Sequence, residues 1–79
     1  MNNRVQVDNA RKVIVAFSKT SEMVDNVIIS DVYVANVSEV YTNESPQVRI
    51  LYHLKGERFK VLMSQFEFFN LLYKYESLS

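Results

Sequence analysis

The sequence has no cysteine, and it has only one glycine, one proline and one histidine among its 79 residues. Without cysteine, the chain can form neither a disulfide nor a thiolate metal site. The single histidine, His53, would need several carboxylates beside it to hold zinc, so we expect no metal and no other cofactor. One glycine cannot build a phosphate-binding loop. Because HExxH and GxSxG motifs are also absent, we predict that the protein is not an enzyme.

Long hydrophobic runs are missing as well. No window holds the ~18 or more apolar residues that a membrane-spanning helix needs. The N-terminal segment MNNRVQVDNARK lacks the apolar stretch of a secretory signal. The absence of cysteine is compatible with a reducing compartment. We therefore expect a cytoplasmic protein that makes no use of a membrane.

The small size of the chain limits how far it can stabilise itself. With 79 residues it is expected to form one domain, 1–79, and a domain of this length buries only ~60% of the surface that its unfolded chain exposes. Disulfides and thiolate metal sites are excluded, which leaves self-association as a support. Hydrophobic residues make up 48% of the chain, including five Tyr and five Phe. We therefore predict a homodimer, with the alternative that the aromatic residues only enlarge a small core.

The most regular pattern is an alternation of apolar and polar residues over 47–63. Lys55-Gly56 interrupts it and predicts a tight turn between two antiparallel strands, since glycine allows positive φ. One parity is apolar and forms the expected core face: Val48, Ile50, Tyr52, Leu54, Phe59, Val61 and Met63. The other parity is expected to point outward and carries most of the basic groups: Arg49, Leu51, His53, Arg58, Lys60 and Leu62.

A helix is predicted directly after this hairpin. Ser64-Gln65-Phe66-Glu67 has the spacing of a capping box. An apolar stripe with helical spacing follows, formed by Phe66, Phe69, Leu72 and Tyr73 and broadened by Phe68 and Leu71. A helix that is apolar on most sides is normally buried on most sides. We therefore expect its free side to bind a partner through three residues: Phe68, Leu71 and Tyr75.

The N-terminal segment is predicted to add strands. Residues 11–18 are rich in β-branched side chains, with Val13, Val15 and Phe17 expected on one side. Val5 and Val7 could begin a further short strand. With the hairpin and the final helix, these segments predict an α+β fold: a small, bent antiparallel sheet or partial barrel of four to five strands, with one C-terminal helix packed on it.

Residues 27–41 are the most ambiguous part of the chain. Their β-branched content favours a strand from about Val27, but Ser21 could instead cap a short helix. The run is too long for one ordinary strand, and its apolar parity changes along the way. We therefore expect a bend or bulge at Asp31 or Asn36. Residues 42–46 are predicted to form a loop in which proline ends the strand pairing.

The net charge is zero, but charges of the two signs are separated along the chain. Residues 22–46 contain acidic residues and neither lysine nor arginine, whereas 1–21 and 47–63 are predominantly basic. Such a distribution can steer a complementary partner. The alternative is that the acidic segment lies beside the basic hairpin and neutralises it.

Two functions fit these patterns. The first is a small non-enzymatic protein-binding module, a homodimeric regulator or inhibitor of a larger protein in the style of phage and mobile-element accessory proteins. Its expected partner-binding residues are Asp25, Asp31, Glu39, Phe68, Leu71 and Tyr75. The second is a nucleic-acid-binding regulator that uses the basic face of 47–63. Its expected nucleic-acid-binding residues are Arg11, Lys12, Arg49, Arg58 and Lys60.

The second function has one point for it and one against. The segments SDVYVANV, VRILYHLKGERFKV and SQFEFFNLL, in this order, resemble the first half of LytTR-type DNA-binding domains. The resemblance covers about half of the chain and carries no functional residue onto this sequence. Nucleic-acid-binding domains are usually basic, however, whereas this chain is neutral.

Overall fold

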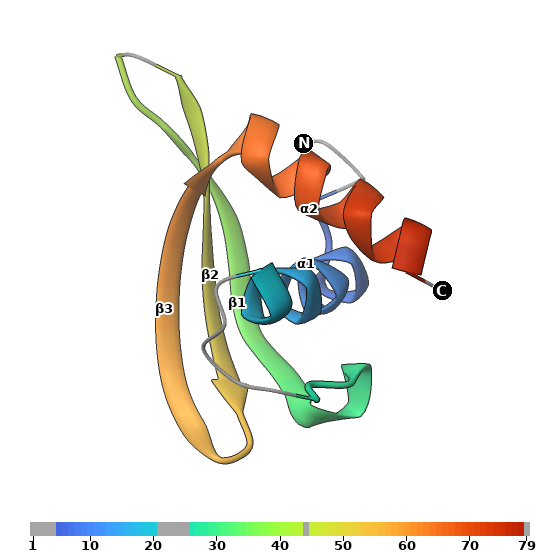
Figure 1. Ribbon diagram of the computed structural model, residues 1–79. Coiled ribbons are helices and arrows are strands. Elements are labelled where there is room, and N and C mark those ends of the chain that lie inside the picture. The colour runs from blue at the N-terminus through green and yellow to red at the C-terminus, as the bar shows by residue number, and fades with distance from the viewer. Residues whose placement is uncertain (1–4, 21–25, 44, 79) are drawn as a thin grey trace.

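The computed structural model describes residues 5–20, 26–43 and 45–78 and has an α+β fold with an open sheet (Figure 1). The three strands pair in the order β1-β2-β3, and both neighbouring pairs are antiparallel. Both helices lie on the same side of this sheet, which leaves its other side uncovered (Figure 1). The elements in chain order are α1 (Val7–Thr20), the short 3-10 helix η1 (Ile29–Asp31), β1 (Val32–Tyr41), β2 (Pro46–Leu54), β3 (Glu57–Ser64) and α2 (Gln65–Leu78).

The prediction of four to five strands and a single helix is wrong in these counts. Residues 11–18 belong to helix α1, and Val5 lies outside any strand. The β-branched residues of this segment favour a strand only weakly, and tertiary packing readily outweighs such a preference. Four of its apolar side chains have the i, i+3, i+4, i+7 spacing of a helix face that packs on the core: Ala10, Val13, Ile14 and Phe17.

The change of parity predicted for 27–41 is confirmed. The strand begins at Val32 rather than near Val27, because the turn of η1 precedes it. Its register with β2 shifts between Val34 and Asn36, so that Ala35 is an extra residue. Val32 and Val34 face the core before this bulge. After it, Val37 lies opposite the buried Ile50 and so faces the helices as well. The alternative helix from Ser21 through Val27 and Ile28 begins outside the described residues, and Val27 and Ile28 themselves are not helical.

The predicted hairpin and helix cap are also confirmed. Lys55 and Gly56 both have positive φ, 51° and 89°, as a two-residue type I′ turn requires. The Ser64 Oγ accepts a hydrogen bond of 3.0 Å from the Glu67 amide at the start of α2. Pro46, in contrast, does not end the pairing. It is the first residue of β2 and lies opposite Tyr41, a position where a missing N–H is tolerated.

The core lies between the sheet and the two helices. Phe68 of α2, Ile14 of α1 and Ile50 of β2 are the largest side chains that are fully buried there. The parity predicted for the first hairpin strand is correct, because its apolar set is buried: Val48, Ile50, Tyr52 and Leu54. Within the described part of the chain, the two helices therefore cover one face of the sheet and make no contact with the opposite face (Figure 1).

Candidate functional site

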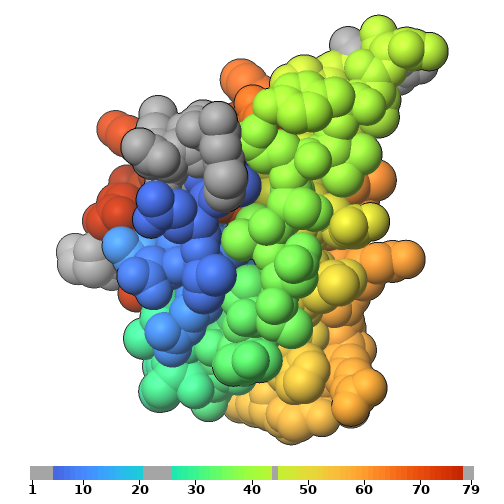
Figure 2. All heavy atoms as spheres, turned by 180° about the vertical axis from the view of Figure 1, so that it is seen from behind, coloured from blue at the N-terminus to red at the C-terminus, as the bar shows by residue number. Residues whose placement is uncertain are grey.

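The side chains of the sheet that point away from the helices form a surface that neither helix covers, here called the open face (Figure 1). It is defined by alternate residues of all three strands: Tyr33, Asn36, Ser38, Val40, Gln47, Arg49, Leu51, His53, Arg58, Lys60 and Leu62. Figure 2 shows the molecule from the side of β1, which runs beside α1 and ends in the projecting β1–β2 loop. The alternation of the strands creates this surface, because every second residue of β2 is needed for the core.

Cross-strand pairing arranges the open face in rows. Tyr33, His53 and Arg58 form one row across β1, β2 and β3. The next rows are Asn36, Leu51 and Lys60, and then Ser38, Arg49 and Leu62. Each of these three rows therefore contains one arginine or lysine. Apolar groups lie between the cations, and Tyr33 and Leu62 expose 62% and 57% of their surface.

An aromatic pair lies at one end of this surface. The rings of Tyr33 and His53 are 5.5 Å apart between centroids and are tilted by 56°. Arg58 lies directly opposite His53 on the neighbouring strand. This row therefore combines an exposed aromatic side chain, an imidazole and a guanidinium, groups that can stack on planar ligands and bind anions.

The open face is basic even though the chain as a whole is neutral. None of the residues that define it is acidic. Glu39, the acidic residue of β1, lies opposite the buried Val48 and so faces the helix side. There it accepts a hydrogen bond from the Tyr41 hydroxyl, which together with its negative charge raises the pKa of that phenol. The local charge of the open face is therefore not cancelled within its own rows.

The predicted nucleic-acid-binding residues are divided between two sides of the molecule. Arg49, Arg58 and Lys60 lie together on the open face, as expected. Arg11 and Lys12 lie on α1 instead. The Arg11 guanidinium donates to the backbone carbonyls at positions 32 and 29, at 3.1 and 3.0 Å, and so ties the helix to the start of β1. Lys12 Nζ is 3.5 Å from a carboxylate oxygen of Glu76 in α2.

The predicted free side of the C-terminal helix requires a correction. Phe68 is fully buried and Leu71 is only 7% exposed, so both belong to the core, and Tyr75 packs against it. The solvent side of α2 instead carries Phe66 and Tyr73, which are 78% and 77% exposed. The i, i+3, i+4, i+7 spacing of Phe68, Leu71, Leu72 and Tyr75 is the sequence signal that could have identified the buried side.

The predicted acidic residues do not form one surface. Asp31 accepts a hydrogen bond from the Ile28 amide at 3.0 Å and so holds the turn before β1. Glu39 lies near the other end of the same strand, on the helix side. Asp25 lies outside the described residues. Sequence separation in a ten-residue strand already places Asp31 and Glu39 about 25 Å apart.

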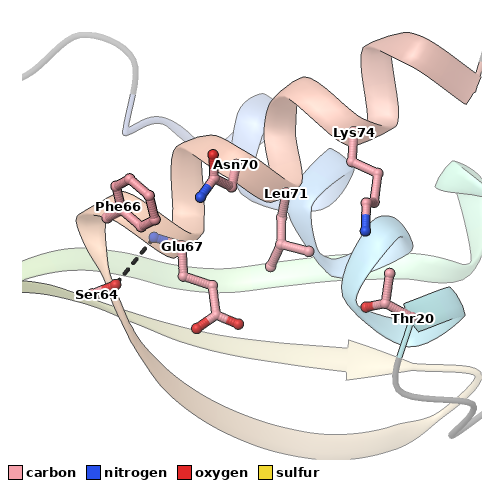
Figure 3. Close-up of a pocket in the computed structure, with 7 residues that line it drawn as sticks. All are labelled: Thr20, Ser64, Phe66, Glu67, Asn70, Leu71 and Lys74. Carbon is pink, nitrogen blue, oxygen red and sulfur yellow. Dashed lines mark hydrogen bonds between the residues drawn. The ribbon is translucent and has the colours of Figure 1, made fainter.

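A shallow groove runs along α2 and reaches the C-terminal end of α1 (Figure 3). Its volume is about 440 Å³. Figure 3 shows Glu67, Leu71 and Lys74 pointing to this side of the helix, and the Phe66 ring at the start of α2. The groove is lined by Thr20, Ser64, Phe66, Glu67, Asn70, Leu71 and Lys74.

Within the described residues, no group of three or more His, Asp or Glu side chains could hold a metal ion. Their helices include none that is long and apolar enough to cross a bilayer. No family model, no curated protein and no solved structure matches this chain. The resemblance in element order to LytTR-type domains is therefore not accompanied by a family match.

Proposed function

We propose that the protein is a small, non-enzymatic binding module that regulates or inhibits a larger protein by docking its open face on an acidic surface of that protein. The observation that carries this proposal is the set of three cations in consecutive rows of an uncovered sheet, without an acidic residue among them. A cytoplasmic location, predicted from the sequence, is part of the proposal.

The mixture of side chains on the open face favours a protein as the partner. Protein interfaces combine apolar contacts at their centre with arginine and tyrosine, which are enriched there. Arg49 and Leu51 lie on the central strand β2, and Tyr33 and Leu62 flank them on the edge strands. Aliphatic groups between the cations would contribute little to a surface that binds only phosphates, but they allow a protein partner to exclude water.

The positive charge of the open face determines which partner surfaces it can bind. Rows of uncancelled cations attract an acidic partner and disfavour a basic one, and this effect weakens as salt screens it. The neutral net charge of the chain limits attraction to anionic polymers in general. Selectivity would therefore come from the local pattern on the sheet.

The test is affinity capture from the native host with three proteins: wild type, Arg49→Glu and Lys19→Glu. Arg49 is exposed on the open face, whereas Lys19 is exposed at the end of α1 and serves as the control for the same change of charge. We expect wild type and Lys19→Glu to capture one acidic protein that Arg49→Glu fails to retain. Equal capture by Arg49→Glu and wild type contradicts the proposal, provided that circular dichroism shows both to be folded.

A second candidate, binding of single-stranded nucleic acid, is favoured by the row of Tyr33, His53 and Arg58. Exposed aromatic side chains beside cations can stack on bases and contact phosphates, and such binding weakens steeply with salt. Half of each capture sample is therefore treated with nuclease. Loss of the captured protein in that half, together with binding of a labelled oligonucleotide that Tyr33→Ala weakens, would favour the second candidate over the first.

A further inference from the structure

The solvent side of α2 carries an unusual concentration of exposed aromatic surface. Phe66 and Tyr73 are the two most exposed large hydrophobic side chains of the described residues, at 78% and 77%. They are seven residues apart, which places them two turns apart on the same flank of the helix. The other phenylalanines are buried or partly buried against the core: Phe68 fully, and Phe17, Phe59 and Phe69 in part. A domain of this size is only marginally stable, so it gains by covering the two exposed rings.

Two opposite charges occupy the other flank of the same helix side. Glu67 and Lys74 are also seven residues apart, about 10.5 Å along the axis, which is too far for them to pair with each other. Both point to the groove side of the helix (Figure 3). Neither of them forms an ion pair with another described residue, whereas Lys12 and Glu76 do pair with each other. Each is therefore available to an opposite charge from outside the chain.

These two flanks are symmetric about Asn70, which is exposed between them. Phe66 and Glu67 precede Asn70 by four and three residues, and Tyr73 and Lys74 follow it by three and four. A two-fold axis that crosses α2 at right angles beside Asn70 keeps each flank on its own side and reverses the direction of the helix. It therefore places Phe66 beside Tyr73 of the partner subunit, and Glu67 beside Lys74 of the partner subunit.

From this self-complementarity we infer that the exposed side of α2 is a homodimer interface, in which two copies of the helix pack antiparallel about an axis at Asn70. An isologous interface requires one patch to match itself after a two-fold rotation, and both the aromatic and the charged flank meet this condition. The interface differs from the predicted one, because Phe68 and Leu71 are used for the core of each subunit.

A single pair of helices buries less than the ~1,600 Å² of a standard interface, so we expect reversible association rather than an obligate dimer. The open face lies on the other side of the sheet and stays accessible (Figure 1). A dimer would therefore present two open faces, which strengthens binding to a partner that offers two acidic sites. The dimer does not depend on the proposed function, since it uses other residues.

The first test exploits the absence of cysteine in the chain. Asn70→Cys places a thiol at the proposed axis, where the two copies meet. Ser77→Cys is the matched control, because it is exposed on the same helix but its two copies lie about 21 Å apart along an antiparallel pair. A disulfide needs Cα atoms within about 7 Å. We expect mild oxidation to cross-link Asn70→Cys into a dimer at least tenfold faster than Ser77→Cys, and equal rates would overturn the inference.

The second test measures the pairing of charges by sedimentation equilibrium. Glu67→Lys and Lys74→Glu each place like charges together across the axis, so each should raise the dissociation constant of the dimer at least tenfold. The combined variant restores opposite charges and should return it to within about threefold of wild type. A combined variant no better than the single ones contradicts the inference, as does a wild-type protein that stays monomeric at high micromolar concentration. Circular dichroism confirms that α2 is intact in each variant.

Discussion

The two faces of the sheet are built from the same strands and yet differ in burial and in charge. In β2, Ile50 is fully buried beneath the helices, whereas its neighbour Leu51 is half-buried on the open face. The buried part of the covered face is aliphatic and aromatic, and the open face mixes cations with apolar groups. Because strand residues alternate between the two, the residues that hold the fold and those proposed to bind are neighbours in sequence. They can therefore be changed separately.

The largest effect should come from breaking the covered face at Ile50. Ile50→Ala removes a fully buried side chain from the central strand and leaves a cavity between sheet and helices. Such changes cost about 2–5 kcal/mol of unfolding free energy. Leu51→Ala makes a similar reduction in size one residue away and should cost no more than about 1 kcal/mol, because that side chain is already partly in water. Urea unfolding of both variants measures the difference.

The informative quantity is the difference in unfolding free energy between Ile50→Ala and Leu51→Ala. Both substitute alanine in the same strand, so the weaker strand preference of alanine affects them about equally. Equal losses of stability would show that the open face is packed in solution, as it would be if it mediated a dimer. The comparison therefore also tests whether this surface is free.

A smaller loss of stability is expected where Arg11 attaches α1 to the sheet. Arg11→Ala removes two hydrogen bonds to the carbonyls of Ile29 and Val32 and leaves these acceptors without that partner. We expect a loss of about 1–3 kcal/mol in unfolding free energy. Lys12→Ala is the neighbouring control, since its ion pair with Glu76 is partly exposed and should contribute less than about 1 kcal/mol. Equal effects of the two variants would argue against this role of Arg11.

The features that could be predicted from the sequence are those set by local geometry. The turn at Lys55-Gly56, the Ser64 cap and the parity of β2 and β3 each depend on a few adjacent residues, and all are present. The basic surface of Arg49, Arg58 and Lys60 follows from that parity, because a strand register fixes which side chains share a face.

The remaining features depend on packing that a local pattern does not contain. The segment of α1 has the β-branched residues of a strand, and its packing against β1 and α2 decides in favour of the helix. In α2, two apolar stripes with helical spacing compete, and the docking angle selects the one with Phe68. The role of Arg11 is not visible in a local pattern either, because its hydrogen bonds reach η1 and the start of β1, 18 and 21 residues further along the chain.

The smallest effect concerns Tyr52, whose phenol belongs to the covered face, where its ring stacks on Phe59. Burial raises the pKa of Tyr52 above its ordinary value of 10.0. The unfolded chain therefore loses this proton first, so the stability linked to it is complete below about pH 10 and is lost as pH rises further. Tyr52→Phe should reduce the fall in unfolding free energy between pH 9 and 11. Tyr33→Phe, which removes an exposed hydroxyl from the open face, is the control and should leave that fall unchanged. An unchanged slope in Tyr52→Phe would mean that the phenol titrates in contact with water.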